Sequence, residues 1–437
     1  MKKFFTTTLA ILTTAVLASC GKGKKETTEG FAPALDTNTT CNIKVVGDYD
    51  SFPELVDEFK EFNNYYPNVR LTYTKITGLY KEMIGTVLEG NEKPNIFFAY
   101  TWMVGNEKYA NVESHMEDLS DPALKINLSC IRPGLVNSEN TLMVPLFGRS
   151  YGMLVNNDLF KKENLNVPNS FNELLTVCDA FLAKGYKNPM MGYSKEVPNN
   201  LMNTVAYPAV VASLANNAEA LALANENNAA AGAYMRDAFN IVDQLAKKGA
   251  FNVGECDLLA DNYDKVIMRF LKGDVPMMIC ADDTPSGTKK REARSEEFIA
   301  NPFSYSYAPV PITSDGGYFI DNPSKLLSVN KNCDNLDMTN EFMRFLVSNE
   351  ELNSMAAKKN LLSSTNEISF DSIYAPFGKV PANKTFSPEG LGFKDIIKEQ
   401  VRKAVFKIAI GTKTSEDDST PRTKITVDEA VANYGSF

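Results

Sequence analysis

The chain has 437 residues, and its 54 acidic residues outnumber its 45 lysines and arginines, which gives a formal net charge of -9. An acidic balance argues against nucleic-acid binding and against adsorption on an anionic lipid surface. The length exceeds what one hydrophobic core supports, so we expect two or three lobes in a soluble globular protein.

The first twenty residues have the pattern of an export signal. Lys2 and Lys3 precede an apolar, Thr-rich run over residues 4–17, which is too short to remain as a membrane span. The run ends in Leu-Ala-Ser-Cys, which resembles the lipobox of bacterial lipoproteins, and the resemblance implies that Cys20 is lipidated. The alternative is an ordinary secretory signal in which Cys20 is coincidental. Residues 21–40 are polar at their start and are predicted to be a flexible tether.

A strand–helix–strand–helix–strand pattern follows the tether. Residues 41–47 form an apolar, β-branched strand, and residues 52–65 form an amphipathic helix with Ser51 as its expected cap and Pro53 in its first turn. Residues 69–76 and 95–100 are predicted strands on either side of a helix over 79–88. This alternation predicts a parallel sheet covered by helices.

The rest of the chain continues the alternation of helices and strands, without an internal repeat. Residues 143–157 are an apolar run with polar residues at its centre, and further strands are predicted at 190–193, 275–280, 305–311 and 325–329. Further helices are predicted at 158–161, 170–184, 239–248, 263–271, 339–348, 350–359 and 427–433, with two more within 205–235 around the Asn-rich stretch 225–228.

Histidine and cysteine usage narrows the chemistry. The one histidine, His115, lies in a polar segment and is expected to be a solvated loop residue, which argues against imidazole-based catalysis and zinc sites. The six cysteines after Cys20 lack metal-ligand or redox spacing, and we favour buried free thiols over as many as three disulfides: Cys41, Cys130, Cys178, Cys256, Cys280 and Cys333. No metal or cofactor is expected.

Four stretches carry a family resemblance. They are Phe-Lys-Glu-Phe with Tyr-Pro-Asn-Val at 59–69, Gly-Met-Leu-Val-Asn-Asn-Asp-Leu-Phe with Val-Pro and Ser-Phe-Asn-Glu-Leu at 152–174, Phe-Leu-Lys-Gly-Asp-Val-Pro-Met-Met at 270–278, and the helix pair at 340–350 with Leu-Leu-Ser at 361–363. In this order they resemble family 1 of the extracellular solute-binding proteins, the ABC-importer receptors to which maltose-binding protein belongs. Phe171 replaces the family's usual tryptophan, and Asp282-Asp283-Thr284 stands where another tryptophan is often found.

The resemblance implies an α/β, two-lobed, periplasmic-binding-protein-like fold of type II. It consists of two parallel or mixed sheets flanked by helices, with a hinge of crossing strands. We assign residues 41–150 and 284–328 to lobe 1 and residues 151–283 and 329–437 to lobe 2. The crossing segments are expected near 148–154, 279–283 and 326–330.

The loops that follow the predicted strands are candidates for the ligand site, because ligands bind beyond the carboxyl ends of strands in open sheets and between lobes. Aromatic rings there can cover the face of a sugar, and charged groups can hydrogen-bond its hydroxyls. Trp102 is the favoured stacking platform, against the alternative of a core residue. Arg149 could instead be a surface charge, and any one aspartate a turn residue. The ten candidates are Asp48, Tyr49, Asp50, Tyr100, Trp102, Arg149, Tyr151, Asp282, Asp283 and Tyr318.

The sequence therefore predicts a monomeric, membrane-anchored receptor of an ABC importer, exported to the outer face of the cell membrane. It would capture a carbohydrate by hinge closure and deliver it to a permease, without catalysis. A polyamine or an anion is the alternative ligand. A surface-anchored glycoside hydrolase is the alternative enzyme, because a carboxylate pair leaves no diagnostic motif. Ser-Gly-Thr-Lys at 286–289 lacks the partner motifs of penicillin-recognising enzymes. A structural or adhesive lipoprotein is the remaining alternative.

Overall fold

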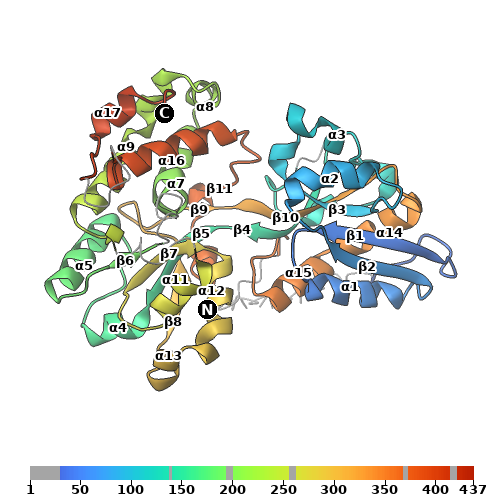
Figure 1. Ribbon diagram of the computed structural model, residues 1–437, viewed down its shortest axis with the longest axis horizontal. Coiled ribbons are helices and arrows are strands. Elements are labelled where there is room, and N and C mark those ends of the chain that lie inside the picture. The colour runs from blue at the N-terminus through green and yellow to red at the C-terminus, as the bar shows by residue number, and fades with distance from the viewer. Residues whose placement is uncertain (1–29, 137–139, 193–199, 255–261, 368–372, 414–420) are drawn as a thin grey trace, which may run out of the picture.

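The computed structural model describes residues 30–136, 140–192, 200–254, 262–367, 373–413 and 421–437, so the predicted signal peptide and Cys20 lie outside it. Two α/β lobes lie side by side, and the strands β4 (Val144–Arg149) and β10 (Asn322–Val329) occupy the space between them (Figure 1). No helix within these ranges is both long and apolar enough to cross a membrane. The predicted two-lobed fold is confirmed.

Lobe 1 is built on a five-stranded mixed sheet in the order β2-β1-β3-β10-β4. Strand β1 (Cys41–Gly47) lies parallel to β2 (Val69–Lys75) and β3 (Ile96–Ala99), as the alternating pattern predicted. Strand β10 returns antiparallel between β3 and β4. The carboxyl ends of β1 and β3 therefore lie at the same edge of the sheet, and the residues that follow both strands are neighbours.

Lobe 2 has a four-stranded sheet in the order β6-β7-β5-β8. Strand β5 (Tyr151–Asn156) is antiparallel to β7 (Met277–Ala281) and β8 (Tyr305–Ala308), and β6 (Met190–Met191) is parallel to β7. A short parallel pair, β9 (Phe319–Ile320) with β11 (Thr385–Phe386), forms a third sheet.

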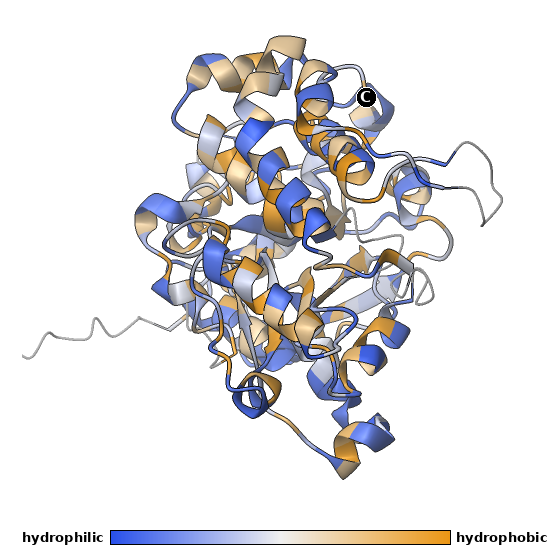
Figure 2. Ribbon diagram, turned by 90° about the vertical axis from the view of Figure 1, so that its left-hand side faces the viewer, coloured by the Kyte–Doolittle hydropathy of each residue, from blue (hydrophilic) through white to orange (hydrophobic). Residues whose placement is uncertain are grey.

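Amphipathic helices cover both sheets. Figure 2 shows lobe 2 from outside, with hydrophobic and hydrophilic residues alternating along its helices. The helices that contribute to the lobe 1 core are α1 (Pro53–Asn63), α2 (Tyr80–Glu89), α3 (Ala110–Glu113), α14 (Leu336–Leu346) and α15 (Asn349–Lys359). Those of lobe 2 are α4 (Asn157–Lys162), α5 (Phe171–Ala183), α7 (Tyr207–Leu214), α8 (Ala218–Asn225), α9 (Gly232–Lys247), α11 (Tyr263–Phe270), α13 (Glu296–Ala300), α16 (Asp395–Ala409) and α17 (Val427–Ala432). Helix α12 (Asp283–Arg291) lies against α11, and its buried residues are small or polar.

Two helix starts test the cap predictions. The Ser170 side chain accepts a hydrogen bond from the Glu173 backbone at the start of α5, as expected of an N-cap serine. The expectation for Ser51 is wrong, because Phe52 is the N-cap of α1 and makes no side-chain cap hydrogen bond. Pro53 takes the first helical position, where its missing N–H and fixed φ favour the start of a helix.

The expected lobe ranges need correction. Tyr307, Val310 and Phe319, from the segment assigned to lobe 1, are buried in the core of lobe 2. Phe342 and Met355, from the segment assigned to lobe 2, are buried in the core of lobe 1. Helices and strands of both lobes have the same amphipathic character, so the sequence pattern does not reveal which core a segment joins.

Three segments cross between the lobes. The β4–β5 junction crosses within the expected range 148–154, since Phe147 belongs to the lobe 1 core and Met153 to that of lobe 2. The second crossing lies between Ile320 of the lobe 2 core and Leu326 of the lobe 1 core, ahead of the expected range 326–330. The third crossing is near residue 361, because Leu361 packs against the lobe 1 core and Leu362 is buried in that of lobe 2. The segment 279–283 was predicted to cross but remains in lobe 2.

A buried ion pair joins these crossing segments. Arg132 Nε lies 2.6 Å from Asp321 Oδ2, and Nη2 lies 3.0 Å from Oδ1, which makes the pair bidentate. Arg132 Nη1 also donates to the carbonyls of Ser363, at 2.5 Å, and Thr365, at 2.9 Å. A Cβ at Gly148 would lie 2.3 Å from Arg132 Nη2, so only glycine allows β4 to approach the guanidinium.

The predicted tether is shorter than expected. Phe31 packs edge-on against Tyr65 and Phe345, with centroids 5.1 and 5.3 Å apart, and the Arg344 guanidinium lies 4.4 Å from its ring centroid. The Ala34 N–H donates to the Glu341 carboxylate at 2.8 Å. Residues 31–34 are therefore held on lobe 1, which corrects the expected 21–40 boundary. An aromatic residue within a polar run is the signal that was missed.

Helices α1 and α15 meet at two carboxyl groups. The fully buried Glu58 accepts hydrogen bonds from Ser354, at 3.1 Å, and from Lys358, at 3.2 Å. Burial, followed by a hydrogen bond with Glu58 and the charges of Glu58, Glu350 and Glu61, raises the pKa of Glu351 to about 9. The folded protein therefore holds the Glu351 proton to a higher pH than the unfolded chain does.

Glu351→Gln is expected to become more stable than wild type as the pH rises. The unfolded chain releases the Glu351 proton near pH 4.5, while the folded protein holds it until about pH 9. Between these pH values the wild-type chain must take up a proton to fold, so its free energy of unfolding falls as the pH rises. Glutamine can donate a hydrogen bond and does not titrate, so the variant does not lose stability in this way. Denaturant midpoints measured from pH 5 to 9 test this, with Glu82→Gln, at an exposed glutamate in the first turn of α2, as control. Parallel profiles for wild type and Glu351→Gln would contradict the shared proton.

Candidate functional site

A cavity of about 370 Å³ lies between the lobes and is lined by residues of both. Lobe 1 contributes the end of β3 and part of β10, lobe 2 contributes α7 and α16, and the crossing strands form the floor. The lining residues are Tyr100, Thr101, Trp102, Arg149, Tyr151, Met202, Asn203, Tyr207, Ile320, Asn322, Pro323, Ser324, Lys325, Leu326, Glu389, Asp395 and Lys398.

The lobe 1 wall of the cavity is aromatic. Strand β3 ends at Ala99, and the 3₁₀ turn Thr101–Met103 that follows brings Tyr100 and Trp102 to the same face. Their rings stack with centroids 5.1 Å apart and planes inclined by 19°. Tyr109 meets the indole edge-on at 4.9 Å. The stacked pair therefore lines the cavity at the end of β3, the strand end at which the sequence predicted ligand contacts.

Asp48 fixes the tyrosine of this pair. The Tyr100 hydroxyl donates to Asp48 Oδ2 at 2.6 Å, because the ends of β1 and β3 lie side by side. Burial, with this hydrogen bond to the carboxylate, raises the pKa of Tyr100 above its usual value, so the phenol stays protonated. Asp48 does not itself line the cavity, and it acts on the site by orienting Tyr100.

Lys325 reaches the same corner from β10. Its backbone has φ of 51°, in the left-handed region that a lysine rarely adopts, although Ser324 and Leu326 on either side pair with β4. Its Nζ lies 4.0 Å from the centroid of the Tyr49 ring and 3.7 Å from Asp48 Oδ1. Burial lowers the pKa of Lys325. Backbone strain of this kind is concentrated at functional sites, and here it carries an ammonium group to the cavity wall.

Arg149 and Tyr151 lie on the floor, where β4 passes into β5. The Arg149 guanidinium lies 5.1 Å from the Tyr151 ring centroid, and its Nε lies 3.9 Å from Asp282 Oδ1. Burial raises the pKa of Asp282 well above its usual value, and the charge of Arg149 opposes that rise. The Arg149 side chain is 42% exposed, which places it at the cavity rather than in a core.

The lobe 2 wall was not predicted. Met202, Asn203 and Tyr207 come from one irregular helix, and Asp395 and Lys398 come from the first turn of α16. Lys398 Nζ lies 5.4 Å from the Tyr207 ring centroid and 3.6 Å from Asp395 Oδ1. These residues lie on helices and follow no predicted strand, so the strand-end criterion could not find them.

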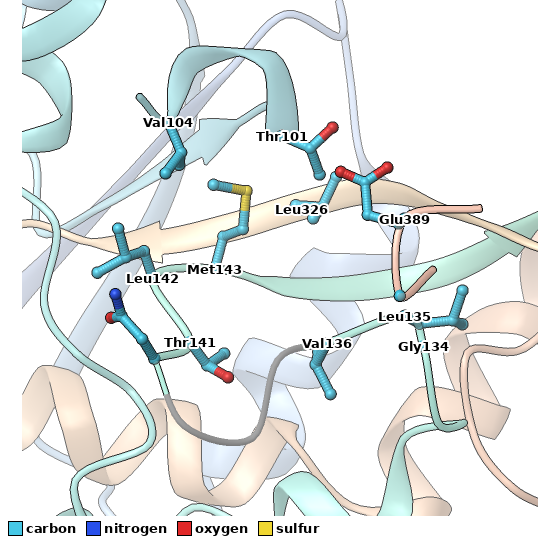
Figure 3. Close-up of a pocket in the computed structure, with 12 residues that line it drawn as sticks. Thr101, Val104, Gly134, Leu135, Val136, Thr141, Leu142, Met143, Leu326 and Glu389 are labelled. Atoms are coloured by element: carbon cyan, nitrogen blue, oxygen red, sulfur yellow. The ribbon is translucent and has the colours of Figure 1, made fainter. Parts of the chain in front are cut away.

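A second cavity of about 610 Å³ adjoins the first and shares Thr101, Leu326 and Glu389 with it. Figure 3 shows Thr101 and Glu389 approaching each other above Leu326, with Val104, Leu142 and Met143 along the lobe 1 side. Its described lining contains no aromatic residue. The interlobe space thus has one part with aromatic walls and one part whose described lining mixes aliphatic and polar residues.

The ten predicted residues separate into four groups. Tyr100, Trp102, Arg149 and Tyr151 line the first cavity, and Asp48, Tyr49 and Asp282 contact or lie close to charged and aromatic groups of that lining. Asp283 is exposed at the first position of α12.

Asp50 and Tyr318 lie away from both cavities. The Asp50 side chain is 92% exposed and pairs with Lys75 at 2.5 Å. Tyr318 packs against Phe386 of β11, with centroids 5.9 Å apart. Both residues follow turn sequences that are typical of a cleft loop. The Asp50 side chain is nevertheless exposed to solvent, and the Tyr318 ring packs against Phe386.

The described cysteines are free thiols as expected, although only Cys130, Cys178 and Cys280 are buried and Cys41 and Cys333 are half-buried. Cys256 lies outside the described residues. His115 follows α3, where Nδ1 lies 2.7 Å from the Asn111 carbonyl. Within the described ranges no group of three or more His, Cys, Asp or Glu side chains is arranged to hold a metal ion.

Solved structures of solute-binding proteins share this architecture. RafE of Streptococcus pneumoniae in its apo form aligns with a TM-score of 0.67 at 15% identity, covering 92% of this chain and 97% of that chain. A family 1 extracellular solute-binding protein of Bifidobacterium longum subsp. infantis gives 0.64 at 14%, covering 91% and 98%. A sugar transporter of Bacillus licheniformis in complex with stachyose gives 0.60 at 12%, covering 90% and 98%. At these identities the likeness establishes the fold.

The sequence itself identifies the family. No curated protein matches the chain, but the family model for bacterial extracellular solute-binding protein matches residues 45–352, which is more than half of its length. Together with the two lobes and the cavity between them, this match shows that the chain belongs to the bacterial extracellular solute-binding protein family.

Proposed function

We propose that the protein is the receptor of an ABC importer and that it binds a neutral saccharide between its lobes. The observation that carries this proposal is the first cavity, where a stacked Tyr100–Trp102 pair faces polar groups from both lobes. Aromatic faces cover the C–H surface of a sugar ring, and polar groups fix its hydroxyls. Similar structures are described as bound to raffinose and to stachyose, or as a chitin oligosaccharide binding protein.

The charges of the cavity support a neutral ligand. Each cation of the described lining lies near a carboxylate: Arg149 is 3.9 Å from Asp282, Lys325 is 3.7 Å from Asp48, and Lys398 is 3.6 Å from Asp395. Glu389 is one further carboxylate of that lining, whereas a polyamine would need several unpaired carboxylates and an anion a surplus of cations. Paired donors and acceptors suit hydroxyl groups, which both donate and accept hydrogen bonds.

Capture by lobe closure and delivery to a permease complete the proposal. A ligand that contacts both walls stabilises the closed arrangement over the open one, which is how a binding event becomes a signal to the importer. The Leu-Ala-Ser-Cys sequence ending at Cys20 supports a lipid anchor at the outer face of the membrane. Stable anchoring requires at least two acyl chains, as one chain binds only marginally.

A thermal-shift screen tests the ligand class. Raffinose, stachyose, xylo-oligosaccharides and chitin oligosaccharides are compared with spermidine, putrescine, amino acids and inorganic phosphate. At 100 times its Kd a bound saccharide is expected to stabilise the protein by about 2.7 kcal/mol, which raises Tm by several degrees. If only spermidine or only phosphate raises Tm, the ligand is a polyamine or an anion and the saccharide proposal is wrong. Chromatography of the recovered saccharide separates receptor from hydrolase, because a receptor returns it unchanged.

A further inference from the structure

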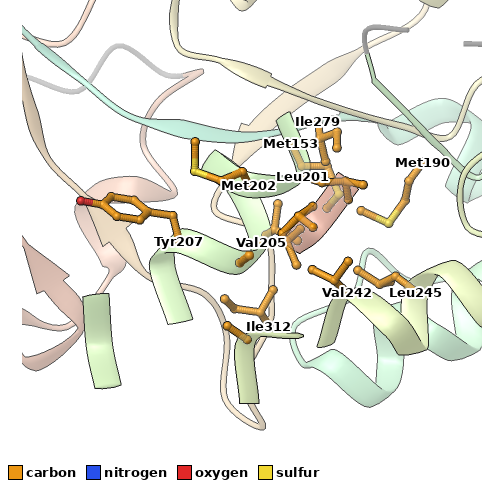
Figure 4. Packing of buried hydrophobic residues seen from close by; sticks show 14 of the residues in the cluster. Met153, Met190, Leu201, Met202, Val205, Tyr207, Val242, Leu245, Ile279 and Ile312 are labelled. Atoms are coloured by element: carbon orange, nitrogen blue, oxygen red, sulfur yellow. The ribbon is translucent and has the colours of Figure 1, made fainter. Parts of the chain in front are cut away.

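Tyr207 is a buried residue of lobe 2 whose hydroxyl is unsatisfied. The residue is 2% exposed and packs edge-on against Phe393, with centroids 6.3 Å apart. The hydroxyl is itself buried, and it has no hydrogen-bond partner among the residues that the structure describes. Figure 4 shows the ring directed away from Leu201 and Val205, which are buried among the core side chains.

The backbone before Tyr207 explains how the ring reaches the cavity. Residues Met202–Ala206 form a π-helical turn, and regular α-helix resumes at Tyr207. A π turn adds a residue to the helical repeat and so rotates the face that follows it, and such turns are frequent at functional sites. As a result Met202, Asn203 and Tyr207 line the cavity that Tyr100 and Trp102 line from lobe 1.

The surroundings of Tyr207 keep its hydroxyl a donor. Burial, followed by the charges of Asp395 and Glu389, raises the pKa of Tyr207 above its usual value. The phenol therefore stays protonated, and it offers an O–H where the described protein groups provide no acceptor. A buried polar group without a partner destabilises a fold, so its position at a cavity calls for a partner outside the chain.

We propose that Tyr207 is the lobe 2 residue that recognises the ligand. Its hydroxyl donates a hydrogen bond to an oxygen of a saccharide whose ring lies against the Tyr100–Trp102 pair. One ligand then contacts both lobes, which ties recognition to closure. This inference rests on the proposed function and adds to it a specific residue, a specific atom and the side of the cleft from which it acts.

Tyr207→Phe separates the hydroxyl from the ring. The variant keeps the packing against Phe393 and removes only the unsatisfied group, so the Tm of the free protein is expected to be unchanged or raised. Its affinity for the saccharide that gives the largest shift among raffinose, stachyose, xylotriose and chitotriose is expected to fall about three- to tenfold. Calorimetric titration measures the Kd, and the single Trp102 provides a fluorescence titration as a second readout.

Tyr434→Phe is a matched control. Tyr434 is also a buried lobe 2 tyrosine whose hydroxyl lacks a partner among the described residues, but it follows α17 and lines neither cavity. The change should affect Tm as Tyr207→Phe does and leave the Kd unchanged.

The outcomes separate the two proposals. A loss of affinity confined to Tyr207→Phe, with Tm maintained, supports the inference. Equal Kd values for wild type and Tyr207→Phe overturn it and leave the receptor proposal intact. If wild type binds none of the four saccharides, both the inference and the saccharide proposal fail.

Discussion

Arg132→Ala is expected to destabilise the protein by about 3–5 kcal/mol, the typical cost of removing one partner of a buried ion pair. Asp321 would remain in place with its side chain only 3% exposed and with no cation to balance it. Burial already raises the pKa of Asp321, and the charge of Arg132 opposes that rise. The substitution also frees the carbonyls of Ser363 and Thr365, which belong to the third crossing segment.

Denaturant unfolding of the ligand-free protein measures this loss, and two variants define its origin. Arg132→Lys keeps the charge without the bidentate geometry and is expected to lie between wild type and Arg132→Ala. Asp50→Asn breaks the exposed pair with Lys75 and should cost about 1 kcal/mol or less. A stability of Arg132→Ala within 1 kcal/mol of wild type would show that the crossing segments do not depend on this pair.

Trp102→Ala is expected to weaken saccharide binding tenfold or more, about 1.4 kcal/mol. The substitution removes the indole from the cavity wall, and it leaves the Tyr100 ring without the neighbour that stacks on it at 5.1 Å. Large aromatic residues at the centre of a binding surface dominate affinity because they bury much area in few rotamers.

Calorimetry is the suitable measurement here, since the variant has no tryptophan to report binding. Trp102→Phe keeps a smaller ring and should lose less affinity than alanine does. Tyr234→Ala removes an aromatic ring from the surface of α9, outside both cavities, and should leave the Kd unchanged. If Trp102→Ala binds the saccharide with wild-type affinity, Trp102 does not contact the ligand. Its role is then to pack against Tyr109 and Lys81.

The strand-end rule found one wall of the site and missed the other. Tyr100 follows β3, and Arg149 and Tyr151 flank the β4–β5 junction, so a search at the ends of predicted strands reaches them. Tyr207 and Lys398 lie on helices, and a buried tyrosine in an apolar helix has the sequence pattern of a core residue. Asp50 shows the converse error, because a polar loop after β1 fits a site equally well whether its side chains turn inward or outward.

The sequence alone determined the export signal pattern, the alternation of helices and strands and the family, because each of these depends on local periodicity or on short motifs at fixed spacing. Only the tertiary structure decided which core each segment joins, which side chains face the cleft, and that residues 31–34 are held on lobe 1. Those features arise from contacts between segments up to hundreds of residues apart, such as Arg132 with Asp321 and Ala34 with Glu341. The spacing of apolar residues along the chain does not identify such partners, because the helices and strands of both lobes have the same amphipathic pattern.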